Sequence, residues 1–207
     1  MVDIVNAPWE GRHDAQVLVP PSAHVAGRKF KGLRGWAGKP LHPPLTDVPV
    51  GAYVLTAAFD LISFVGGDDQ PWARDFYRAA SFTLIGGAVV SVFAALTGFW
   101  DWKNSTEVGT QARRTANAHG WTMVTVTVLV IAGIAVRVAA FWDEQATPAL
   151  ALVLTLAAAA LTFLGGTIGG SLAYDYGFNV ETAGDHPVWH RSETDVFPGE
   201  QHEAPSD

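Results

Sequence analysis

The feature that most constrains this chain is a set of four long segments that carry almost no charged side chains. They cover residues 48–66, 79–100, 121–142 and 148–176. About 20 apolar residues in a helix, at about 1.5 Å each, cross the hydrocarbon core of a bilayer. A helix in a soluble core would carry a polar stripe, whereas these segments are apolar almost all round. The sequence therefore predicts an all-α integral membrane bundle of four transmembrane helices.

The composition supports a membrane protein with polar ends. Charged residues make up 16% of the 207 residues, against about a quarter in soluble proteins. They gather in a polar, basic segment at 1–39 and in an acidic tail at 181–207, which is expected to be disordered, on either side of a transmembrane domain at 40–180. With no cysteine, disulfides and thiolate metal sites are excluded. No metal site and no nucleic-acid partner is expected.

Basic residues near the helix ends predict the orientation. Before the first helix stand Arg28, Lys29, Lys31, Arg34 and Lys39, and between the second and third stand Lys103, Arg113 and Arg114. The other side has Arg74 and Arg78 together with several acidic residues. Because basic loops stay in the cytoplasm, both termini are expected there. The chain is then a multi-pass protein of the cell inner or plasma membrane, with the lipid bilayer as its main partner.

Small residues repeat at helical spacing on two of the predicted helices. The second carries Gly87, Ser91 and Gly98, and the fourth carries Gly165, Gly169 and Gly170. Such rows let helix backbones approach closely in lipid. They also suit a flat ligand such as a porphyrin or a quinone, so both uses stay open.

Two ionisable residues fall inside predicted spans. Asp60 lies in the first helix and Arg137 in the third. These helices run in the same direction, so the two side chains are expected at similar depth. Intramembrane charges usually face the bundle interior and pair with each other. The pair is either a structural ion pair or a site in which Asp60 carries protons.

A second polar layer is expected where the first and third helices begin. It brings together His42, Asp101, His119 and Tyr174. Asp47 is expected to cap the first helix, with Pro49 in the first turn, which leaves His42 on an extended proline-rich loop. Two histidines at one level of a bundle can ligate a b-type haem. The alternatives are a structural network with Asp101 and backbone carbonyls, or a quinone site. Asp101 and Tyr174 would surround the histidine pair.

Four motifs in order resemble one family of bacterial membrane proteins. They are HPPLTDVPVGAYVLTAAFDLI, TGFWDW, AHGW and GGTIGGSLAYDYGFNV. The chain resembles the family called domain of unknown function 2231 over roughly residues 40–180. The resemblance implies four membrane helices and emphasises His42, Pro43, Asp60, Gly98, Asp101, His119, Gly169, Gly170, Tyr174 and Gly177. Some members are followed by a Rieske iron–sulfur domain, which implies a redox partner; this chain, without cysteine, cannot hold that cluster itself.

Three functions remain open from the sequence. The first is a non-catalytic membrane subunit or scaffold, associated with a membrane or redox partner. The second is a membrane redox protein that binds haem b or quinone between His42 and His119. The third is a proton or small-solute pathway through Asp60, which four helices would serve only as a homo-oligomer. No nucleophile or phosphate-binding motif is present, so the sequence leans against an enzyme.

Overall fold

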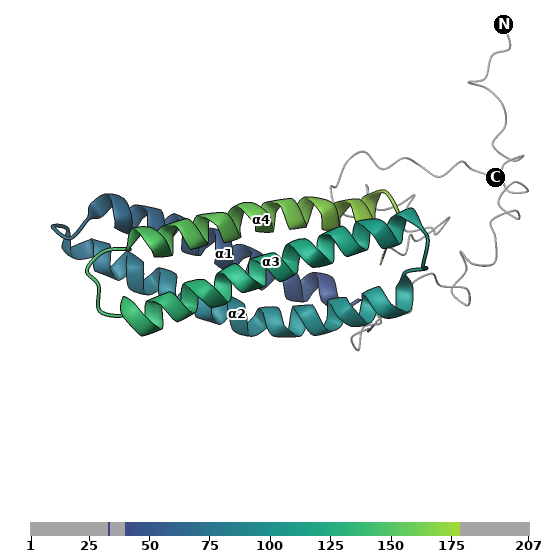
Figure 1. The fold of residues 1–207 in the computed structure, drawn as a ribbon, viewed down its shortest axis with the longest axis horizontal. Coiled ribbons are helices and arrows are strands. Elements are labelled where there is room, and N and C mark those ends of the chain that lie inside the picture. The colour runs from purple at the N-terminus through teal and green to yellow at the C-terminus, as the bar shows by residue number, and fades with distance from the viewer. Residues whose placement is uncertain (1–32, 34–39, 179–207) are drawn as a thin grey trace, which may run out of the picture.

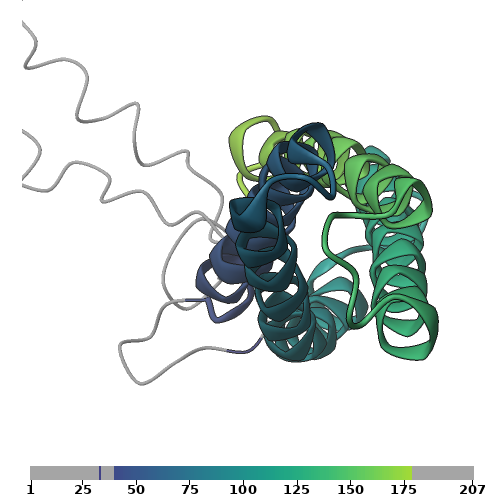
Figure 2. The same cartoon turned by 90° about the vertical axis from the view of Figure 1, so that its left-hand side faces the viewer.

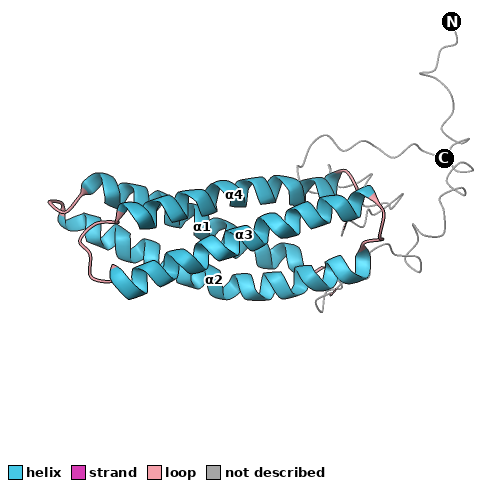
Figure 3. Cartoon of the chain, in the orientation of Figure 1, coloured by secondary structure: helices cyan, strands magenta, loops and turns pink. Residues whose placement is uncertain are grey.

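The computed structural model describes residue 33 and residues 40–178. The basic residues 28–31 and 34–39 and the acidic tail lie outside this part. Four helices form the described chain: α1 (His42–Gly66), α2 (Pro71–Ser105), α3 (Gln111–Ala140) and α4 (Ala149–Tyr174). Short connections join them, as Figure 3 shows. The helices run up and down in sequence along one long axis (Figure 1).

The helices pack as two hairpins. α1 lies against α2 over most of its length, and α3 lies against α4. The hairpins meet mainly through α1 and α4, and α2 contacts α3 least. Figure 2, which looks along the bundle, shows the two hairpins side by side. The backbones of α1 and α3 do not approach each other closely, and neither do those of α2 and α4. The two helices of each of these pairs therefore lie diagonally opposite each other.

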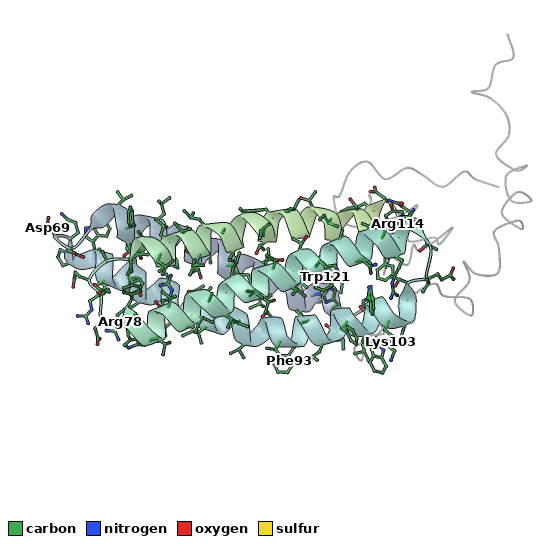
Figure 4. The ribbon with its side chains drawn as sticks, in the orientation of Figure 1. Asp69, Arg78, Phe93, Lys103, Arg114 and Trp121 are labelled. Atoms are coloured by element: carbon green, nitrogen blue, oxygen red, sulfur yellow. The ribbon has the colours of Figure 1, made fainter. Side chains whose placement is uncertain are left out.

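Large apolar side chains cover much of the surface of the bundle, as lipid requires. All four helices are long and apolar enough to cross a membrane. Large side chains such as Phe93, Leu96 and Trp121 point outward, while the buried core is built around Tyr53, Leu84, Val126, Val130 and Ala158. This confirms the predicted all-α membrane bundle. Charged residues lie at the two ends, Asp69 and Arg78 at one and Lys103 and Arg114 at the other (Figure 4).

We call the end at which α1 and α3 begin the histidine end, and the opposite end the Asp60 end. Each predicted span corresponds to one helix, and α2 and α3 begin 8 and 10 residues earlier than expected. At 35 residues, α2 is about 52 Å long. Its ends therefore project beyond a hydrocarbon core of about 30 Å.

The start of α1 corrects the expectation for His42 and Asp47. α1 begins at His42 with Leu41 as its N-cap, so His42 is helical rather than part of a loop. Prolines follow at once, and the first turn tolerates them because its N–H groups have no partner within the helix. Asp47 is therefore inside the helix and does not cap it. Pro49 also lies inside α1, where it is buried.

Candidate functional site

The histidine end brings His42 and His119 close together across the α1–α3 diagonal. Their ring centroids are 6.4 Å apart, and the ring planes meet at 81°. Both side chains are only partly exposed. The backbones of the two helices that supply the rings do not approach each other closely, so the histidines bridge the centre of the bundle from opposite sides.

Each histidine is anchored by a carbonyl of the neighbouring helix. His42 Nδ1 lies 2.9 Å from the Ala94 carbonyl oxygen of α2, and His119 Nδ1 lies 2.9 Å from the Gly165 carbonyl oxygen of α4. A carbonyl oxygen can only accept, so Nδ1 must carry the proton in both rings. In the neutral imidazole, Nε2 then keeps its lone pair. Both rings are thus fixed in the tautomer that offers Nε2 to a metal.

A glycine lies beside each ring. A Cβ atom at position 98 would come within 2.6 Å of His42 Cε1, and one at position 169 within 3.1 Å of His119 Cε1. Both distances are shorter than an ordinary contact, so the side chain of any other residue would displace the ring. Gly98 and Gly169 therefore lie where a histidine of the neighbouring helix packs against the helix backbone.

The two hairpins supply equivalent halves of this layer. In each, a histidine near the start of the first helix bonds a carbonyl of the second, and the glycine four residues after that carbonyl lies against the ring. The same correspondence continues to the Asp60 end. Asp60 follows His42 by eighteen residues, and Arg137 follows His119 by eighteen.

The other residues expected near the histidines lie apart from the pair. Asp101 is buried, and its Oδ1 accepts the Leu33 N–H at 3.1 Å. Its Oδ2 has no hydrogen-bond partner in the described part of the chain. Tyr174 is 89% exposed and lines an open groove of about 510 Å³ between α1 and α4. Neither residue has a hydrogen bond to a histidine among those described.

At the Asp60 end, a buried ion pair joins the same diagonal. Arg137 Nη2 donates to Asp60 Oδ2, and both side chains are 1% exposed or less. Thr155 Oγ1 donates to Asp60 Oδ2 at 2.7 Å, and Thr147 Oγ1 donates to Asp60 Oδ1 at 3.0 Å. Arg137 Nη1 donates to Ser81 Oγ at 2.9 Å. All four helices and the α3–α4 connection therefore meet at one charged pair.

Aromatic and loop contacts complete this cluster. The Arg137 guanidinium lies 4.9 Å from the centre of the Tyr77 ring, and Tyr77 donates its hydroxyl to the Phe141 carbonyl at 2.9 Å. Ser63 accepts the Thr147 N–H at 3.0 Å. Arg137 Nε is buried without a hydrogen-bond partner in residues 40–178, and the Tyr77 ring adds a cation–π contact to the guanidinium.

The remaining small residues lie in three kinds of place: at contacts between helices, on their own helix, and beside the groove. A Cβ at Gly87 would come within 2.6 Å of the Ala52 side chain, and one at Gly165 within 2.6 Å of Met123. Those two positions therefore let helices of one hairpin approach closely. Ser91 donates to the Ala88 carbonyl of its own helix. Gly170 borders the groove beside Tyr174.

Sequence reasoning missed the hydroxyl groups and carbonyls that hold the charged and histidine layers. Thr147, Thr155, Ser81 and Ser63 look like ordinary residues of apolar helices, since threonine and serine usually bond their own helix. The carbonyls of Ala94 and Gly165 carry no side-chain signal at all. The one available signal was the spacing of histidine and charge, eighteen residues in both α1 and α3.

Comparison with known proteins gives one match. The family model described as predicted membrane protein (DUF2231) matches residues 38–182, which covers all four helices and both polar layers. No curated protein and no solved structure matches the chain. The match spans well over half of the sequence, and its description agrees with the membrane bundle. The chain therefore belongs to the DUF2231 family of predicted membrane proteins.

Proposed function

We propose that the protein is a membrane redox protein that holds a b-type haem between His42 and His119. The observation that carries this proposal is the 6.4 Å separation of two imidazoles whose Nδ1 atoms are both anchored. With metal–nitrogen bonds of about 2.0–2.1 Å, two imidazoles on opposite sides of one metal ion have ring centres roughly 6 Å apart. The spacing of the pair matches that arrangement.

The donor set fits haem iron better than a free metal ion. No group of three or more metal-binding side chains occurs in the described part of the chain. Protein zinc sites need three or four such ligands. Haem iron takes four nitrogens from the porphyrin and needs only two from the protein. Gly98 and Gly169 let both rings pack directly against a helix backbone, which fixes the position of each ring.

The residues of the chain would each have a defined task. His42 and His119 would hold the haem iron, each through its Nε2 atom. The Ala94 and Gly165 carbonyls would orient the rings and make Nε2 more basic, as partners of ligating histidines generally do. The surrounding apolar helices would limit access of water. The haem would supply a one-electron couple, and two histidine ligands suit electron transfer.

Absorption spectroscopy tests this proposal directly. The protein, purified in detergent from haem-sufficient cells, is expected to show a Soret band and sharp bands on reduction. Gly86→Ala serves as the matched control, because a Cβ there meets nothing within 4 Å, and it should keep the spectrum. The double variant His42→Ala/His119→Ala should be colourless although it folds. A colourless wild-type protein would overturn the proposal and leave a non-catalytic membrane subunit or scaffold.

In this proposal the Asp60 cluster has a structural role: it holds the four helices together and is not a proton pathway. Both oxygens of the Asp60 carboxylate have donors, from Arg137, Thr155 and Thr147. With both oxygens already accepting hydrogen bonds, this carboxylate is committed to fixed donors and is poorly placed to relay an incoming proton. In liposomes, the wild-type protein should therefore conduct protons no faster than the Asp60→Asn variant. A proton flux that this substitution abolishes would contradict the structural role of Asp60.

The proposed orientation places the histidine end and both termini in the cytoplasm. Within the described residues, this end has Arg113 and Arg114 in the first turn of α3 and Lys103 in the last turn of α2. The Asp60 end has Arg74 and Arg78, but Asp68, Asp69 and Asp75 lie beside them. Basic residues near helix ends favour the cytoplasmic side, and acidic ones contribute little. The same orientation would put the haem near cytoplasmic redox partners.

A further inference from the structure

The two halves of the histidine layer share a pattern but differ at two positions. Three residues after Ala94 stands Thr97, whereas three residues after Gly165 stands Ile168. Asp101 in α2 likewise corresponds to Leu172 in α4. Each difference gives the α2 half a polar side chain where the α4 half has an apolar one, so the environments of His42 and His119 are not the same.

Thr97 shares the anchor of His42. The Thr97 hydroxyl lies within donor distance of two carbonyls of its own helix, Phe93 at 2.9 Å and Ala94 at 3.0 Å, and the Ala94 oxygen also accepts His42 Nδ1. The hydroxyl also lies 3.5 Å from Nδ1 itself. A carbonyl oxygen that already accepts a hydrogen bond from a hydroxyl is a weaker acceptor for a second donor. Ile168 has no hydroxyl to offer the Gly165 carbonyl, so the anchor of His119 is not divided in this way.

The helices also hold the two histidines differently. His119 is the ninth residue of α3, with two full turns before it. His42 is the first residue of α1, and helix ends fray more easily than interiors. The chain before His42 depends on a relay: Asp101 accepts the Leu33 N–H, and Leu33 accepts the Leu41 N–H at 3.1 Å. The position of His42 thus depends on a residue outside α1, namely Asp101 of α2.

We propose that His42 is the exchangeable ligand of the pair, and that the position it vacates binds a small neutral diatomic molecule such as carbon monoxide. This inference rests on the proposed haem site. On exchange, His42 would give up its place on the haem with its Nε2 lone pair, and carbon monoxide would take that place through its carbon. The proton stays on Nδ1, and the iron keeps its oxidation state. His119 stays bound throughout and retains the haem.

Single histidine variants give the first test. His42→Ala should keep its haem and, after reduction with dithionite, bind carbon monoxide at once. His119→Ala should lose its haem. The wild-type protein should bind carbon monoxide slowly, because His42 must leave first. Equal haem loss in both variants, or retention only in His119→Ala, would overturn the inference.

Variants of the relay give a second test that leaves both histidines in place. Asp101→Ala releases Leu33, so carbon monoxide should bind several fold faster than in the wild type. Asp101→Asn keeps an acceptor oxygen and should restore the slow rate. Leu172→Ala, at the corresponding position of α4, is the matched control and should leave the rate unchanged. Equal rates in Asp101→Ala and Leu172→Ala would overturn the inference even if the His119 variant fails to fold. A wild-type protein without haem would instead overturn the proposed function.

Discussion

Asp60 and Arg137 pair across the same diagonal of the bundle that His42 and His119 span at the other end. In both α1 and α3, eighteen residues separate the two layers. Eighteen residues make five helical turns, which is about 27 Å. The polar residues of each helix therefore share one face and lie near opposite boundaries of a hydrocarbon core of about 30 Å. The centre of the bilayer is left to apolar packing around Tyr53 and Val130.

Breaking the ion pair from one side should strongly destabilise the bundle. Arg137→Met leaves the Asp60 carboxylate buried without its counter-charge. Removing one partner of a buried pair costs about 3–5 kcal/mol. Thermal or denaturant unfolding in detergent should show a loss of this size.

The matched double variant controls for simple loss of packing. Asp60→Leu together with Arg137→Met removes both charges and should regain much of the loss, because apolar replacements of a buried pair are often close to neutral. The comparison also needs the single variant Asp60→Leu. If the double variant lost as much stability as the two single variants added together, the ion pair would not be the source of the destabilisation.

Gly98 should resist even the smallest substitution. A methyl group there would come within 2.6 Å of His42 Cε1, and overpacking of this kind costs about 1–3 kcal/mol. Gly98→Ala should lower the unfolding midpoint in detergent. Gly86→Ala, on the same helix but with nothing within 4 Å, should raise it slightly, because alanine favours a helix over glycine by about 1 kcal/mol. Equal effects at both sites would show that the His42 ring is not fixed against α2.

The membrane fold was predictable because the bilayer imposes a simple rule on helix length and polarity. The four helices and their order follow from counts of apolar residues. The beginning of α1 did not follow, since the prolines after His42 read equally as an extended loop and as a first helical turn. Only packing of His42 against Ala94 and Gly98 distinguishes the two, and such contacts between distant residues leave no local signal.

The polar layers were predictable in outline and not in their connections. Asp60 and Arg137 stood out because charge is rare in a span, but the donors from Thr147 and Thr155 did not. The two halves of the histidine layer look unrelated in sequence, because their shared features are two carbonyls and two glycines. Tyr174 was placed with the histidines from its position along α4. The rotation of the helix instead turns it outward.

The orientation can be measured cleanly because the chain has no cysteine of its own. A single Asp69→Cys variant labels the α1–α2 connection, and a single Glu107→Cys variant labels the α2–α3 connection. With a membrane-impermeant thiol reagent, Asp69→Cys should react in intact cells and Glu107→Cys only after lysis, as expected from the basic residues at the histidine end. The reverse pattern would place the proposed haem on the outer side of the membrane.

Haem titration of the purified apoprotein tests the central claim most directly. The haem site predicts saturation at one haem per chain, with the spectrum of iron that carries two histidine ligands, and no saturable binding in the His42→Ala/His119→Ala double variant. Binding that never saturates, or that is the same in the double variant, would contradict the account and leave the two histidines a purely structural pair.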